Sequence, residues 1–83
     1  METREMVKQY IIENFLFGDT DPLQSDSMSL LDEGIIDSVG VMELVAFLEQ
    51  DFELAIDDKD LIPENLDSVD NLVAFIGRKQ TSA

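Results

Sequence analysis

Residues 34–44 read Gly34-Ile35-Ile36-Asp37-Ser38-Val39-Gly40-Val41-Met42-Glu43-Leu44. The first part of this stretch closes a long connection, and the second part opens an amphipathic helix expected from Ser38 to about Phe52. Asp37 stands where a helix N-cap is expected, because its carboxylate can accept a backbone N–H of the first turn. The stretch therefore predicts that Ser38 is presented at the start of a helix.

The helix expected after Asp37 carries two apolar groups. The first recurs at three- and four-residue spacing and is assigned to the core: Val41, Leu44, Val45, Leu48 and Phe52. The second lies roughly 100–160° further round the helix, at 3.6 residues per turn: Val39, Met42 and Ala46. Glu43 and Glu49 border the second group. It is either a wider core or an exposed docking face, and the pattern leaves both open.

A first helix is expected from about Thr3 to Phe17, because Val7, Ile11 and Phe15 recur at four-residue spacing. Gly18 and the acidic, proline-containing residues after it should stop this helix. The connection from Gly18 to Asp37 is long for a compact domain. A short turn is expected near residues 29–33, and apolar residues should pack the connection over the helices: Leu23, Met28, Leu30, Leu31, Ile35 and Ile36.

The C-terminal part of the sequence predicts a single helical turn over Asp57 to Leu61, a second turn at residues 63–65, and a last helix. Asp67 or Ser68 should cap this last helix, and Gly77 should end it. Four apolar residues mark this last helix: Val69, Leu72, Val73 and Ile76. The predicted fold is all-α, a small bundle of three main helices plus one short helix with a long first loop, in a single domain over residues 1–83.

The charge balance is strongly acidic, with 19 Asp and Glu against 5 Lys and Arg and a formal net charge of -14. No cation occurs from Gln9 to Asp58. Nucleic acids and anionic membranes would be repelled, so neither nucleic-acid binding nor membrane insertion is expected. Basic protein surfaces are the natural partners. No apolar run has the length of a signal peptide or membrane span, and a cytoplasmic location is expected.

The sequence contains no histidine and no cysteine. Ser38 therefore has no evident general base to activate it as a nucleophile, and we do not expect an enzyme. A calcium-binding EF-hand starting at Asp19 and Asp21 is excluded, because Leu30 stands where the bidentate glutamate belongs. An acidic helical interaction protein that carries nothing, such as an inhibitor or DNA mimic, stays open.

The order Gly34, two apolar residues, Asp37, Ser38, any residue and Gly40 resembles the attachment motif of acyl and peptidyl carrier proteins. The resemblance covers almost the whole chain. It implies that a phosphopantetheinyl transferase attaches 4'-phosphopantetheine from coenzyme A to Ser38. It also implies that Asp37 is associated with this modification reaction and with the magnesium that the reaction uses. Glu43 and Leu44 match the acidic-apolar pair of the family, and Val39 replaces the usual leucine.

The same resemblance implies a stand-alone carrier that shuttles acyl groups as thioesters between enzymes of fatty acid or polyketide biosynthesis. Gly34 lies three residues before Asp37, whereas the common fatty-acid version has its glycine two before. That spacing looks more like carriers of specialised pathways, including the D-alanyl carrier, so an aminoacyl or peptidyl cargo stays open. The chain is expected to be a monomer.

The implied partners are an acyl- or aminoacyl-loading ligase and downstream biosynthetic enzymes with basic docking surfaces. These partners are expected to contact the second apolar group of the helix and its acidic border: Val39, Met42, Glu43, Ala46 and Glu49. Charge would steer the encounter, and apolar contact would set the register.

Overall fold

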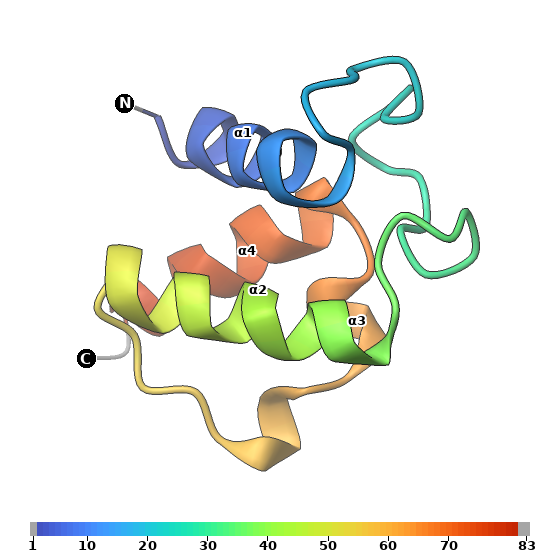
Figure 1. Ribbon diagram of the computed structural model, residues 1–83. Coiled ribbons are helices and arrows are strands. Elements are labelled where there is room, and N and C mark those ends of the chain that lie inside the picture. The colour runs from blue at the N-terminus through green and yellow to red at the C-terminus, as the bar shows by residue number, and fades with distance from the viewer. Residues whose placement is uncertain (1, 82–83) are drawn as a thin grey trace.

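The structure is a computed structural model that describes residues 2–81, and over that range it is all-helical (Figure 1). This confirms the predicted class, a bundle of three main helices with one short helix. The elements are α1 (Thr3–Phe15), α2 (Ser38–Asp51), the 3-10 turn η1 (Asp58–Asp60), α3 (Pro63–Leu66) and α4 (Val69–Thr81). None of the helices in the described range combines the length and the apolar character needed to cross a membrane.

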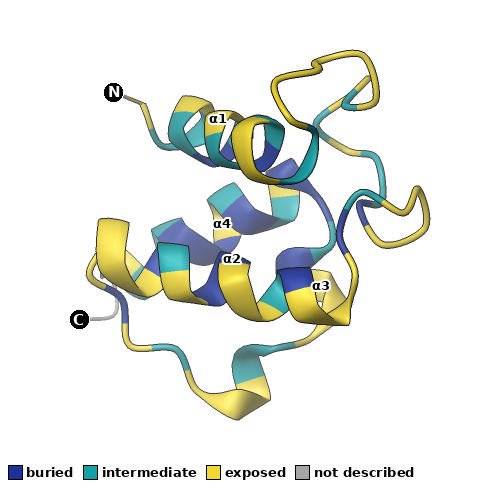
Figure 2. Ribbon diagram, viewed as in Figure 1, coloured by how far each residue is buried: buried dark blue, intermediate teal, exposed yellow. Residues whose placement is uncertain are grey.

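The core lies where the apolar faces of α1, α2 and α4 meet (Figure 2). The backbones of α1 and α3 each approach α4 closely, whereas α2 joins the bundle mainly through its side chains. Burying an aliphatic side chain of this kind contributes about 1.5–3 kcal/mol. Among residues 2–81, seven core side chains have no exposed surface: Val7, Ile11, Leu44, Leu48, Val69, Leu72 and Ile76.

Burial confirms most of the predicted core positions and corrects a few. In α2, Leu44, Val45 and Leu48 are buried as expected, but Val41 is only partly buried, as is Phe52, the residue after the helix ends. Phe15 at the end of α1 is also only partly buried. These three residues pack against the rim of the core rather than within it.

Two helix ends differ from the prediction. α1 ends at Phe15 rather than Phe17, because Phe17 and Gly18 take positive φ values of 53° and 88°. The Gly18 N–H then turns back to the Ile12 carbonyl at 2.9 Å. α4 runs on to Thr81, so the expectation that Gly77 ends it is wrong. Gly77 does not take the positive φ that would end a helix.

The predicted turn at Asp57–Leu61 is confirmed as η1, which a reciprocal capping box between Asp57 and Asp60 closes. The predicted turn at residues 63–65 is instead the short helix α3, with Pro63 at its start, where proline fits well. Ser68 rather than Asp67 caps α4, because its hydroxyl oxygen accepts the Asn71 N–H at 3.0 Å.

Asp67 instead fixes the long connection to the start of α4. Its carboxylate accepts the Ser29 hydroxyl at 2.6 Å and the Leu31 N–H at 2.9 Å. Its carbonyl accepts the Leu30 N–H at 2.6 Å. Leu30 and Ile36 are buried as predicted, whereas Leu31 is exposed. The connection is therefore packed down, and residues 29–33 form a hydrogen-bonded turn.

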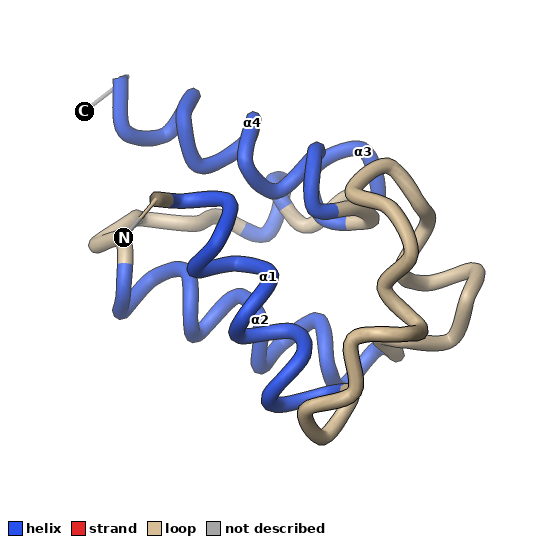
Figure 3. The backbone as a smooth tube through the Cα atoms, turned by 90° about the horizontal axis from the view of Figure 1, so that it is seen from above, coloured by secondary structure: helices blue, strands red, loops and turns tan. Residues whose placement is uncertain are grey.

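Asp26 ties the middle of the connection to α1 and α4. Its carboxylate pairs with Arg4 at 2.8 Å and Lys8 at 3.1 Å, and its carbonyl accepts the Asp70 N–H at 2.9 Å. The hydrogen bond from Lys8, aided by that from Arg4, holds the pKa of Asp26 below its ordinary value. The connection lies at the end of the bundle where α1 ends and α2 begins (Figure 3).

Candidate functional site

Asp37 is the N-cap of α2, as the sequence predicted. Its backbone is extended, with φ −110° and ψ −173°, and its Oδ1 accepts the Gly40 N–H at 2.7 Å. Its carbonyl accepts the first bond of the helix, from the Val41 N–H at 2.9 Å. A cap of this kind contributes about 1 kcal/mol and fixes where the helix begins.

Ser38 is the first residue of α2, and it is exposed. Within residues 2–81 no side chain or backbone group is hydrogen-bonded to its hydroxyl. Asp37 occupies the Gly40 N–H, but the N–H groups of Ser38 and Val39 are left at the positive end of the helix. A phosphate ester on the Ser38 hydroxyl fits there, because such N–H groups and the helix dipole favour an anion.

Gly40 allows the end of α1 to pack against the start of α2. A Cβ at this position would lie 2.9 Å from Cε1 of Phe15 and 3.2 Å from Cγ2 of Ile36. Any larger residue would therefore push these side chains away from the first turn of α2. The sequence showed this glycine within the motif, but only the packing gives the physical reason for it.

The residues just before Asp37 also fix its position. Gly34 has a φ of 73°, a conformation that favours glycine, and its N–H reaches the Leu31 carbonyl at 3.1 Å. Ile36 is 3% exposed and inserts into the core one residue before the cap. Asp37 and Ser38 are therefore held in place at the surface by the buried residue directly before them.

The second apolar group of α2 is an exposed face and not a wider core. The exposed fraction is 69% for Val39 and 59% for Met42, and Ala46 is exposed too (Figure 2). Glu43 and Glu49 are exposed beside them. The structure brings this face and Ser38 onto one helix, so helix geometry alone fixes their separation at about 1.5 Å of rise per residue.

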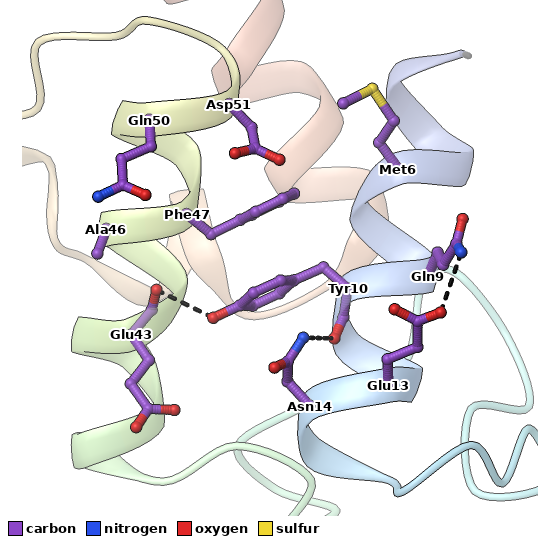
Figure 4. Close-up of a pocket in the computed structure, with 10 residues that line it drawn as sticks. All are labelled: Met6, Gln9, Tyr10, Glu13, Asn14, Glu43, Ala46, Phe47, Gln50 and Asp51. Carbon is purple, nitrogen blue, oxygen red and sulfur yellow. Dashed lines mark hydrogen bonds between the residues drawn. The ribbon is translucent and has the colours of Figure 1, made fainter.

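Four aromatic side chains fill the seam between α1 and α2, and the sequence did not predict this arrangement. The rings of Tyr10 and Phe47 stack with centroids 4.0 Å apart and planes at 12° (Figure 4). Phe15 and Phe52 extend the row through edge contacts of 5.8 and 5.7 Å. The stack of Tyr10 on Phe47 could not be read from spacing within one helix, because it joins α1 to α2.

Comparison with known proteins identifies the protein family to which this chain belongs. Residues 16–76, well over half of the chain, match the family described as "Phosphopantetheine attachment site". The chain therefore belongs to this family of carrier proteins, which bear a covalent 4'-phosphopantetheine and are generally not catalytic. Membership implies contact with a phosphopantetheinyl transferase and with biosynthetic enzymes in general. The predicted family and cofactor are confirmed.

One similar protein is the probable acyl carrier protein PigG of a Serratia species, strain ATCC 39006. It is 33% identical to this chain over 69 residues, which cover 83% of this chain and 78% of the relative. The family match favours a carrier over the acidic interaction protein that carries nothing.

Proposed function

We propose that Ser38 is the residue that receives 4'-phosphopantetheine. The observation that carries the proposal is an exposed hydroxyl, free of hydrogen bonds within residues 2–81, on the first residue of α2. Asp37 beside it holds the helix start in place. When bound, the group supplies a thiol that holds cargo as a thioester. The chain's own contribution is to present the hydroxyl and then to orient the phosphate at the helix end.

The cargo proposed is an acyl group. The name of the relative, an acyl carrier protein, supports this choice. The position of Gly34 three residues before Asp37 keeps an aminoacyl or peptidyl cargo as the alternative. Mass spectrometry of the carrier recovered from the cells that make it, before and after thioester cleavage by hydroxylamine, distinguishes the two. Release of a hydroxamic acid without an amino group supports the proposal, and release of an aminoacyl or peptidyl hydroxamic acid refutes it.

Attachment at Ser38 is tested by intact-mass measurement after incubation with coenzyme A and a promiscuous phosphopantetheinyl transferase. The wild-type chain should gain one phosphopantetheine group, and Ser38→Ala should gain none. Ser27→Ala is the matched control, because Ser27 is also an exposed serine directly after an aspartate. A Ser38→Ala protein that is still modified, or a Ser27→Ala protein that is not, would contradict the assignment.

Partner enzymes are proposed to dock on the exposed face of α2 formed by Val39, Met42 and Ala46, with Glu43 and Glu49 at its border. The double charge reversal Glu43→Lys and Glu49→Lys should slow loading by partner enzymes and leave the fold intact, because both side chains are exposed. Glu5→Lys with Asp58→Lys makes the same change of net charge at exposed positions elsewhere. Equal loading rates for the two double variants would refute docking on this face.

A further inference from the structure

A groove of about 530 Å³ runs between α1 and α2 (Figure 4). The partly buried rings of Tyr10 and Phe47 line it, one from each helix. The Tyr10 hydroxyl crosses to α2 and donates to the Glu43 carbonyl at 3.1 Å. This hydrogen bond and the ring stack connect α1 to α2, and they hold the two rings that line the groove in fixed positions.

The border of this groove is acidic. The carboxylates of Glu13, Glu43 and Asp51 lie along it, and among residues 2–81 no lysine or arginine lines it. Burial raises the pKa of Tyr10, and the negative charges of Glu43 and Asp51 raise it further. The same negative field that disfavours a phenolate favours a cation in the groove.

The aromatic lining and the acidic border of the groove determine which kind of ligand it can bind. An anion would be repelled by the three carboxylates, and a long acyl chain would meet charged groups along both helices. A bound metal ion is disfavoured, because residues 2–81 hold no cluster of three or more acidic side chains able to ligate one. A planar cation suits both parts of the site, since a guanidinium can stack on aromatic rings and hydrogen-bond to carboxylates at its edge.

We infer that the groove between α1 and α2 binds an arginine side chain of a partner enzyme. The guanidinium lies against Tyr10 and Phe47 and pairs with the carboxylates of the border. The inference extends the proposed carrier function, because Glu43 and Ala46 belong both to the groove and to the exposed docking face of α2. Contact at the face and in the groove together would fix the rotation of a partner around α2.

Nuclear magnetic resonance titration of the 15N-labelled, unmodified protein with N-acetyl-arginine amide tests this inference directly. The signals of Tyr10, Phe47 and Asp51 should shift and saturate. N-acetyl-citrulline amide has nearly the same shape but no charge, and N-acetyl-lysine amide has the charge without the plane. The citrulline amide should bind the groove about two- to fivefold more weakly than the arginine amide, the factor expected for loss of a partly exposed cation–π contact. The lysine amide should also bind more weakly than the arginine amide, because an ammonium cannot stack as a plane or form two parallel hydrogen bonds to a carboxylate.

Two variants and a control locate the binding. Asp51→Asn should weaken binding of the arginine amide, whereas Asp58→Asn removes the same charge from an exposed position outside the groove and should not. Phe47→Leu should abolish the preference for arginine over lysine, with circular dichroism to check its fold. If Phe47→Leu unfolds, the comparison of Asp51→Asn with Asp58→Asn still decides.

Equal shifts with the arginine and citrulline amides would overturn the inference. So would arginine shifts spread evenly over the acidic surface, or equal losses in Asp51→Asn and Asp58→Asn. The titration does not require a modified Ser38, so its outcome is independent of the mass experiment. A groove that binds arginine in a protein that is never modified would refute the proposed function alone.

Discussion

Replacing Asp37 by alanine removes the carboxylate that accepts the Gly40 N–H at 2.7 Å. Loss of an N-cap typically costs about 0.5–2 kcal/mol. Gly40 is buried against Phe15 and Ile36, so water has little access to the N–H left behind. A buried donor without a partner costs about 1–3 kcal/mol, and we therefore expect the upper half of the cap range, about 1–2 kcal/mol. For a domain of this size the melting temperature should fall by roughly 4–16 °C.

Asp37→Asn separates the capping role from the charge. Asparagine caps about as well as aspartate, so this variant should keep the free energy of unfolding within a few tenths of a kcal/mol of the wild type. Urea unfolding followed by circular dichroism measures both variants, and the rate of phosphopantetheine transfer is measured on the same samples. An alanine variant that loses less than about 0.5 kcal/mol, or an asparagine variant as unstable as the alanine one, would refute the capping argument.

Three further perturbations test the packing and the electrostatics. Added salt should raise the melting temperature, because the net charge of -14 repels itself in the folded state; a flat or falling melting temperature from low to moderate salt would contradict this. Asp26→Asn should destabilise the protein at pH 7. A lowered pKa means that the Asp26 carboxylate stabilises the folded state only while it is ionised. The difference in stability between wild type and variant should therefore shrink as the pH falls below about 3.8, the ordinary pKa of an aspartate. Urea unfolding across pH 3–7 checks it, and a constant difference would exclude the ion pairs as its source. Gly40→Val should cost about 1–3 kcal/mol by crowding Phe15. Gly77→Ala should instead gain about 0.5–1 kcal/mol, because an added Cβ there meets no atom of residues 2–81 within 4 Å. Similar effects of the two substitutions would refute the close contact at Gly40.

The helices and the attachment motif could be predicted from the sequence because their signals are local. Val7 and Ile11, one helical turn apart, are both buried, and so are Leu44 and Leu48. Asp37 caps the helix that begins at Ser38 because an aspartate at that point satisfies an N–H three residues on. The four-residue spacing and the capping aspartate can both be read within a few residues of the chain, although the burial itself comes from packing against other helices.

The features that the sequence did not predict depend on contacts between distant segments. Asp67 looked like a cap of its own helix, but its carboxylate holds Ser29 and Leu31. Gly77 was expected to end the last helix, yet Lys79 beyond it forms an ion pair with Asp60 at 2.6 Å, which favours another turn. A glycine in a helix costs only about 1 kcal/mol, and an ion pair near the surface contributes up to about 1 kcal/mol, so the two effects are of similar size.

The two contact regions of α2 depend on the fold in different ways. Ser38, Val39 and Met42 lie on one helix, so their separation stays the same however α2 packs. The groove needs α1 and α2 in register, and that register rests on the contact of Gly40 with Phe15 and on the ring stack. A substitution that loosens α1, such as Gly40→Val, should therefore weaken arginine binding in the groove more than docking on the exposed face. Ser38 and the exposed face therefore keep their spacing even where the seam between α1 and α2 has opened.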